Sequence, residues 1–96
     1  MSGYVLKKAT SELDWVLSWA NGYLQPGEYV EADLGWRILP VEAEDDLMVA
    51  AQRFDSTASY AAFSGGVPGK VYMVSAQVRT DQGRELERSI VMRIAA

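Results

Sequence analysis

Apolar and polar residues alternate along four segments of this chain, and this pattern constrains the fold more than any other feature. A β-strand turns successive side chains to opposite faces, so the alternation predicts strands with one face on a core and one in water. The segments cover residues 12–20, 27–39, 70–80 and 85–95. Their predicted inward residues are Leu13, Trp15, Leu17 and Trp19; Val30, Ala32, Leu34, Trp36 and Ile38; Tyr72, Val74, Ala76 and Val78; and Leu86, Ile90, Met92 and Ile94.

Three weaker segments complete the set of predicted strands. They cover residues 4–9, 47–55 and 59–65. Acidic residues precede the middle one, so a short helix over residues 42–54 is the alternative there. Lys7 and Lys8 lie on the first segment, where charge would protect an edge strand from stray pairing.

Glycine and proline separate these segments and predict turns. Gly65 and Gly69 lie in the turn before residue 70, and Gly83 suits the left-handed position of a short hairpin loop. Seven short strands separated by regular turns predict an all-β fold, a β-sandwich formed by one domain over residues 1–96. A small barrel is the alternative.

Three aromatic residues are predicted to build this fold. Trp15 and Trp36 lie on inward faces and are expected to fill the core. Tyr72 begins the sixth strand directly after the Pro68-Gly69 turn. Sandwich domains carry a tyrosine corner at that place, with a buried ring and a hydroxyl bonded to the backbone of the corner.

The chain contains neither cysteine nor histidine. Thiolate and imidazole metal ligands, disulfides and the usual general base near neutral pH are therefore missing, and the prediction is a non-enzymatic protein without cofactors or metals. A net charge of −4 disfavours binding to nucleic acid. The sequence has no signal peptide pattern and no apolar run long enough to span a bilayer, so we expect a soluble protein made in a reducing cytoplasm.

One group of carboxylates and one group of glycines resemble ligand sites only superficially. Residues 42–46 hold four acids, but their spacing is not that of a calcium loop, and an exposed acidic loop is the simpler interpretation. The glycine-rich segment 65–69 precedes a strand rather than a helix, which argues against a phosphate loop.

Exposed tyrosines and arginines are the candidates for contact with a partner. Tyr23 lies in a predicted loop and Tyr29 on a polar strand face, and such amphipathic side chains are favoured at interfaces. Arginines gather on the last hairpin, where they can pair with Glu85 and Glu87 or dock on an acidic partner surface. The predicted partner-contact residues are Tyr23, Tyr29, Arg79, Arg84 and Arg93, while Arg88 falls on the inward face near the start of its strand.

A set of motifs runs through nearly the whole chain and is densest in the last third. It comprises Leu13-Asp14-Trp15, Trp19, Gly27, Trp36, Ser64-Gly65-Gly66, Gly69, Tyr72, Thr80, Gly83, Arg84 and Arg88-Ser89-Ile90. This order resembles a family of small tailed-phage proteins, the fiber-tail adaptor proteins. The chain departs from the family pattern at residues 28–31 and 61–63.

The resemblance implies an immunoglobulin- or fibronectin-III-like sandwich that acts as a virion structural protein. It would attach a tail fibre or spike to the tail or neck, in several copies, with other virion proteins as its partners and neither nucleic acid nor membrane. Capsid decoration and head–tail joining would fit the same fold. A small sandwich module that binds carbohydrate or another ligand is the alternative from a different class.

Overall fold

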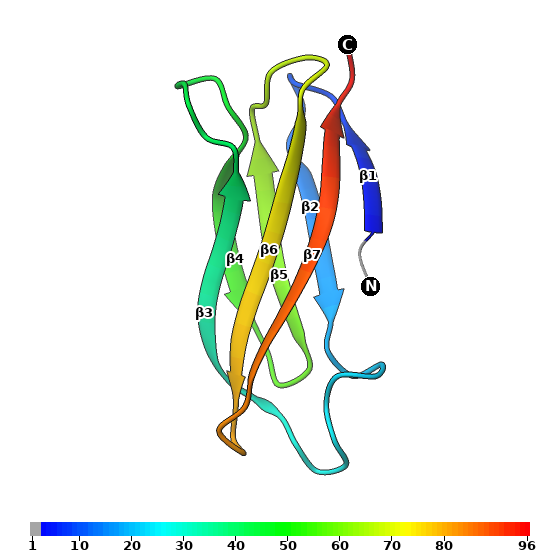
Figure 1. Cartoon of the computed structure of the whole chain (residues 1–96), viewed down its shortest axis with the longest axis vertical. Coiled ribbons are helices and arrows are strands. Elements are labelled where there is room, and N and C mark those ends of the chain that lie inside the picture. Colours follow the sequence, from blue (N-terminus) through cyan, green and yellow to red (C-terminus); the bar gives the residue numbers. More distant parts are fainter. Residues whose placement is uncertain (1–2) are drawn as a thin grey trace.

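The computed structural model describes residues 3–96. These residues form seven strands and no helix (Figure 1). The all-β prediction is confirmed, and the helix alternative for residues 42–54 is wrong. The immunoglobulin- or fibronectin-III-like subtype stays a prediction. The strands are β1 (Gly3–Lys7), β2 (Leu13–Ser18), β3 (Val30–Leu39), β4 (Met48–Phe54), β5 (Ala58–Ser64), β6 (Val71–Thr80) and β7 (Glu85–Ile94).

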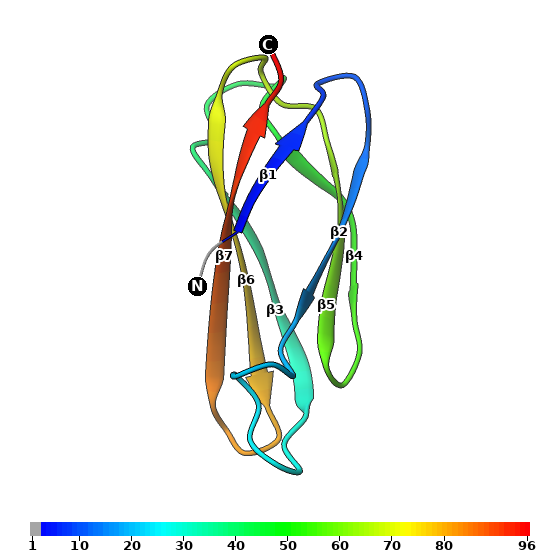
Figure 2. The ribbon, with the colours of Figure 1, turned by 90° about the vertical axis from the view of Figure 1, so that its right-hand side faces the viewer.

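The strands form two separate sheets that pack face to face as a sandwich (Figure 2). The larger sheet has the order β1-β7-β6-β3 and the smaller has β2-β5-β4. All neighbours are antiparallel except β1, which runs parallel to the second half of β7. The molecule is elongated, 43 Å by 21 Å by 19 Å. We call its two ends the corner end, with the loop before β6, and the hairpin end, with the β6–β7 turn.

The core lies between the inner faces of the two sheets. The inward residues predicted for β6 are all buried, and so are the last three predicted for β7. Trp19 is fully buried beyond the end of β2, where its Nε1–H donates a 2.9 Å hydrogen bond to Ser59 Oγ. Trp15 and Trp36 are half-buried against this core, and Trp36 meets Phe63 edge-to-face at 5.4 Å between ring centroids.

The single apolar face predicted for residues 30–38 is wrong at its centre. Two register shifts interrupt the pairing of β3 with β6, after Val30 and after Asp33. Each shift adds a residue to β3 and resets which face the next side chain occupies. Leu34 is consequently exposed, whereas Trp36 and Ile38 return to the inner face.

The expectation that Lys7 protects an edge by its charge is also wrong. Lys7 is only 2 % exposed, and its ammonium donates hydrogen bonds to the carbonyl oxygens of Lys8 and Gly65 at 2.8 and 2.7 Å. Burial lowers the pKa of this lysine. Lys8, the next residue, is exposed.

Candidate partner-binding surfaces

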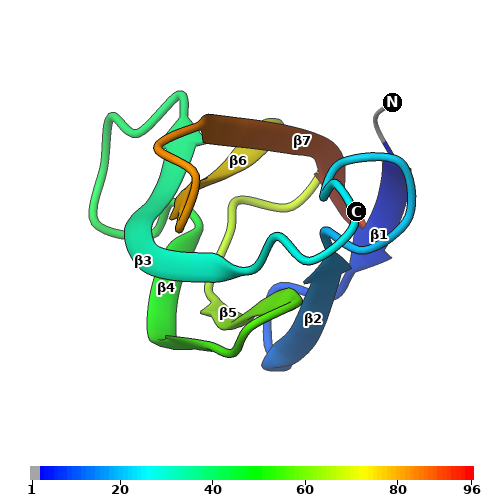
Figure 3. The same cartoon turned by 90° about the horizontal axis from the view of Figure 1, so that it is seen from below.

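The structure brings four of the five predicted partner-contact residues to the hairpin end. Figure 3 views the ribbon from this end. Arg79 is the last residue of β6 that pairs with β7, Tyr29 directly precedes β3, and Arg84 follows the β6–β7 turn. The guanidinium of Arg84 donates a 2.7 Å hydrogen bond to the carbonyl oxygen of Tyr23. Arg93 lies near the other end of β7, so the five residues do not form one surface.

Arg84 holds the loop between β2 and β3 against the β6–β7 turn. Its Nη2 and Nε donate to the two carboxylate oxygens of Glu28, at 2.5 and 2.9 Å. Thr80 Oγ1 donates to the same carboxylate at 2.6 Å, and the backbone N–H of Gln25 donates at 2.8 Å. The Glu28 side chain is completely buried and that of Arg84 is 38 % exposed. Glu28 therefore has an internal structural role, and so has Arg84.

The Glu28 carboxylate makes folding depend on pH. Hydrogen bonds from Arg84, and further ones from Thr80 and Gln25, lower its pKa from 4.5 to about 2 against the opposing effect of burial. A depressed pKa contributes stability that is complete above pH 4.5 and is lost as the pH falls towards 2. We expect Glu28→Gln to be less stable than the wild type at pH 7 and to lose less stability between pH 5 and 2.

Urea titrations at a series of pH values measure this difference directly. The gap between the unfolding midpoints of the wild type and Glu28→Gln should narrow below pH 4.5. Exposed Glu87 lies on the same hairpin, so Glu87→Gln serves as the control and should follow the wild type. Parallel curves for Glu28→Gln and the wild type would contradict the assignment.

The two tyrosines at the hairpin end differ in their surroundings. Tyr23 is half-buried, with its ring edge-on to Trp19 at 5.6 Å and the Arg88 guanidinium 5.4 Å from its centroid. Tyr29 is 47 % exposed, while its backbone exchanges two 3.0 Å hydrogen bonds with Asp81. Tyr29 therefore offers a ring to a partner from a fixed backbone.

The remaining arginines make few contacts with carboxylates. Arg79 Nε lies 4.0 Å from Glu31 Oε2, and both side chains are about half exposed. Glu85 is the cross-strand neighbour of Arg79 on β7, but no ion pair within residues 3–96 joins Arg79 to Glu85 or Glu87. Arg88 points inward as predicted and donates to the carbonyl oxygen of Ser18 at 2.9 Å. Its Nε atom is buried and has no hydrogen-bond partner within residues 3–96.

At the corner end, Tyr72 and Asp46 form a buried pair. The Tyr72 ring is fully buried, its oxygen accepts a 3.1 Å hydrogen bond from the N–H of Val67, and its hydroxyl donates to Asp46 Oδ1 at 2.5 Å. Lys70 Nζ lies 2.8 Å from the same Oδ1 atom. Gly65 and Gly69 have positive φ angles of 73° and 83°, which side chains rarely adopt, and they shape the loop that places these groups.

Asp46 corrects the prediction of an exposed acidic loop at residues 42–46. It is 3 % exposed, and its Oδ2 accepts hydrogen bonds from the backbone N–H groups of Glu42 and Ala43. Its pKa is lowered well below the ordinary value, mainly by the hydrogen bond from Lys70. The other three acids of the segment are exposed. No cluster of three or more acidic side chains suited to a metal ion occurs within residues 3–96.

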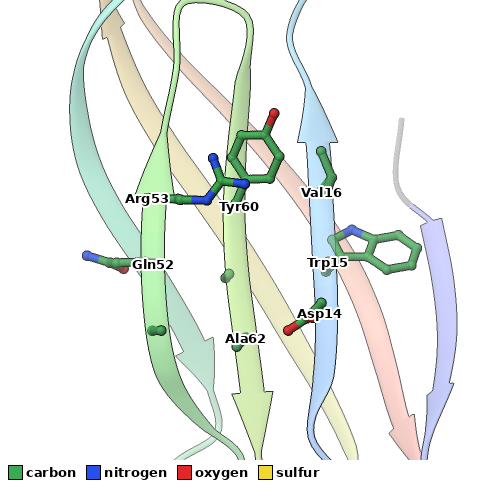
Figure 4. A pocket seen from close by; sticks show the side chains of 9 residues that line it. Asp14, Trp15, Val16, Gln52, Arg53, Tyr60 and Ala62 are labelled. Atoms are coloured by element: carbon green, nitrogen blue, oxygen red, sulfur yellow. The ribbon is translucent and has the colours of Figure 1, made fainter.

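A shallow groove of about 420 Å³ lies over the three-stranded sheet, across β2, β5 and β4 (Figure 4). Ala51 and Ala62 line it together with Val16, Asp14 and Tyr60. The Arg53 guanidinium lies 3.7 Å from the centre of the Tyr60 ring, and the Tyr60 hydroxyl donates to Asp55 at 2.7 Å. A sugar binds to aromatic residues by stacking on an open ring face, and here Arg53 already covers a face of Tyr60.

The comparison with known families identifies the chain. A family model described as Podophage GP4 fiber-tail adaptor protein gp77 matches residues 7–93. The chain belongs to this family. The resemblance drawn from the sequence motifs is thereby confirmed, and no curated protein matches the chain.

Membership of this family places the chain among the structural adaptors of phage particles, and this family is not a class of enzymes. An adaptor works by binding other virion proteins. No helix in the described part of the chain is long and apolar enough to cross a membrane. The chemically relevant features are therefore surfaces that other proteins can contact.

Two features of these surfaces were missed by sequence reasoning. Nothing in the sequence indicates that Glu28 pairs with Arg84, because the two residues are 56 positions apart and lie in separate turns. The outer face of the four-stranded sheet carries exposed apolar side chains, and alternation could have found them. Val71 and Met73 fall on the face of β6 that also holds Ser75, Gln77 and Arg79.

Proposed function

We propose that this protein attaches a tail fibre or spike to the tail or neck of a podophage particle, in several copies arranged by the symmetry of the tail. The observation that carries the proposal is the family match over residues 7–93. Synthesis in the cytoplasm of the bacterial host, followed by assembly into the virion, belongs to the same proposal.

The geometry supports this proposal through the separation of the candidate contact residues. An adaptor needs two binding surfaces, one for each of the parts that it joins. Tyr29, Arg79 and Arg84 lie at the hairpin end, and Arg93 lies towards the corner end of a molecule 43 Å long. The ion pair between Glu28 and Arg84 fixes the loops at the hairpin end, and this lowers the entropic cost of binding a partner at that end.

Deletion of the gene from the phage genome tests the proposal. We expect particles with filled heads and complete tails that lack fibres and fail to adsorb to host cells. Expression of the wild-type protein from a plasmid should restore the fibres. Cryo-electron microscopy of the restored particles should locate the protein between tail and fibre.

The same experiment separates the alternatives. Heads and tails that fail to join would indicate a head–tail joining protein, and density on the capsid would indicate decoration. Either result would contradict the adaptor function, as would the absence of the wild-type protein from purified particles.

A further inference from the structure

An exposed apolar patch covers half of the outer face of the four-stranded sheet. Strand pairing places Tyr4, Val91, Met73 and Leu39 in one row across β1, β7, β6 and β3. The next row towards the corner end holds Leu6, Arg93 and Val71. We call the apolar members of these two rows the outer apolar patch: Tyr4, Leu6, Leu39, Val71, Met73 and Val91.

The side chains of this patch are open to solvent. Five of them are between 49 % and 64 % exposed, and Val91 is half-buried among them. Nothing else in residues 3–96 covers this face, which forms one outer layer of the sandwich in Figure 2. Together they expose on the order of several hundred Å², the size at which an apolar patch on a soluble protein marks an interaction site.

The patch ends abruptly along the sheet. The next row towards the hairpin end holds Arg37, Ser75 and Ser89, and the one after it Gln77 and Glu87. Polar side chains are what the wet face of an antiparallel sheet normally carries. The apolar character is therefore confined to the half of the sheet near the corner end.

The charges in and beside the patch have one sign. Arg93 lies within it, between Leu6 and Val71, and Arg37 borders it. Among the ion pairs of the described residues, none involves either arginine. The chain as a whole is acidic, with a net charge of −4, so two unpaired arginines at an apolar surface favour a partner with carboxylates.

A second copy of the chain fits this face poorly. If the two apolar patches met across a two-fold axis, the Arg93 side chains of both copies would be enclosed in the contact without a carboxylate to pair with, because the two rows of the patch contain no acidic residue. If the second copy were turned end for end, with its hairpin end beside the corner end of the first, each apolar patch would lie on the polar half of the other sheet. Unpaired charges or buried polar groups disfavour both arrangements.

We propose that the outer apolar patch, with Arg93 and Arg37, is the docking surface for an apolar face of another virion protein whose carboxylates pair with these arginines. This inference rests on the proposed adaptor function and assigns one of its two binding surfaces. Apolar burial supplies the affinity, and the arginines select and orient the acidic partner.

Complementation of the gene deletion with surface variants tests the assignment. Met73→Glu places a negative charge at the centre of the patch, and Arg93→Glu reverses the charge within it. Gln77→Glu and Glu87→Lys make matched changes on the polar half of the same two strands. The melting temperature of each purified variant shows whether it folds. Quantitative mass spectrometry of purified particles then gives the number of copies of the variant and of the fibre per particle.

We expect Met73→Glu and Arg93→Glu to reduce the number of copies per particle, or of fibres per particle, by roughly tenfold or more. The two control variants should match the wild type. If both patch variants fold and leave particles with wild-type amounts of this protein and of fibre, the surface assignment is wrong while the adaptor function stands.

Two further outcomes would also overturn the assignment. A wild-type protein that is a dimer in sedimentation experiments, and that Met73→Glu converts into a monomer, would show that a second copy covers the patch. Absence of the wild-type protein from particles would overturn the adaptor function and this inference with it.

Discussion

Trp19→Ala is expected to destabilise the protein by about 3–5 kcal/mol, a large part of the roughly 5–15 kcal/mol that stabilises a domain of this kind. Trp19 is fully buried, and its ring meets Tyr23 edge-on at 5.6 Å. The substitution would leave a large cavity between the sheets and would leave Ser59, itself fully buried, without its indole donor. Urea unfolding followed by circular dichroism measures the loss.

Two variants serve as controls for this prediction. Ser59→Ala keeps the tryptophan ring but leaves its buried indole N–H without an acceptor, and it should cost about 1–3 kcal/mol. Val16→Ala lies on the exposed face of β2 and should change stability by less than about 0.5 kcal/mol. A loss of no more than about 1 kcal/mol for Trp19→Ala would mean that this tryptophan is not a principal element of the core.

Asp46→Ala is expected to lower the melting temperature by roughly 10 °C or more, because several buried or half-buried donors would lose their acceptor together. The donors are the hydroxyl of Tyr72, the ammonium of Lys70 and the backbone N–H groups of Glu42 and Ala43. Because Tyr72 is fully buried, bulk solvent does not reach its hydroxyl to take the place of the carboxylate. Differential scanning calorimetry measures the shift.

The neighbouring residue provides the control. Asp45 is exposed, so Asp45→Ala should leave the melting temperature within about 2 °C of the wild type. Asp46→Asn keeps the shape but loses the charge that pairs with Lys70, and it should fall between the two. Equal melting temperatures for Asp45→Ala and Asp46→Ala would show that the corner does not depend on this carboxylate.

Much of the fold could be predicted from the sequence because apolar and polar residues alternate regularly along β6 and β7. The buried residues of β6 and the inward position of Arg88 follow directly from a period of two. The prediction fails where the period is interrupted. Gly35, which has a φ of 105° at the second register shift of β3, is the one sequence mark of a bulge there, and reading the segment as uninterrupted assigns Leu34 to the wrong face.

The polar residues were harder to assign than the apolar ones. Asp46 belongs to an acidic run that reads as an exposed loop, and only the folded chain shows that Tyr72, 26 positions later, reaches it. Arg84 was predicted to contact a partner, and its bidentate contact with Glu28 emerges only when two distant turns meet. Partners of buried polar groups come from the whole fold, and a local pattern does not contain them.

The parallel pairing of β1 with β7 has a mechanical consequence. Five residues of β1, from Gly3 to Lys7, pair with Ile90 to Ile94, so the start of β1 and the end of β7 lie at opposite ends of this contact. A pull that drew these two points apart along the strands would strain all the hydrogen bonds between them at once. Such a shearing load meets far more resistance than one that opens a strand pair bond by bond.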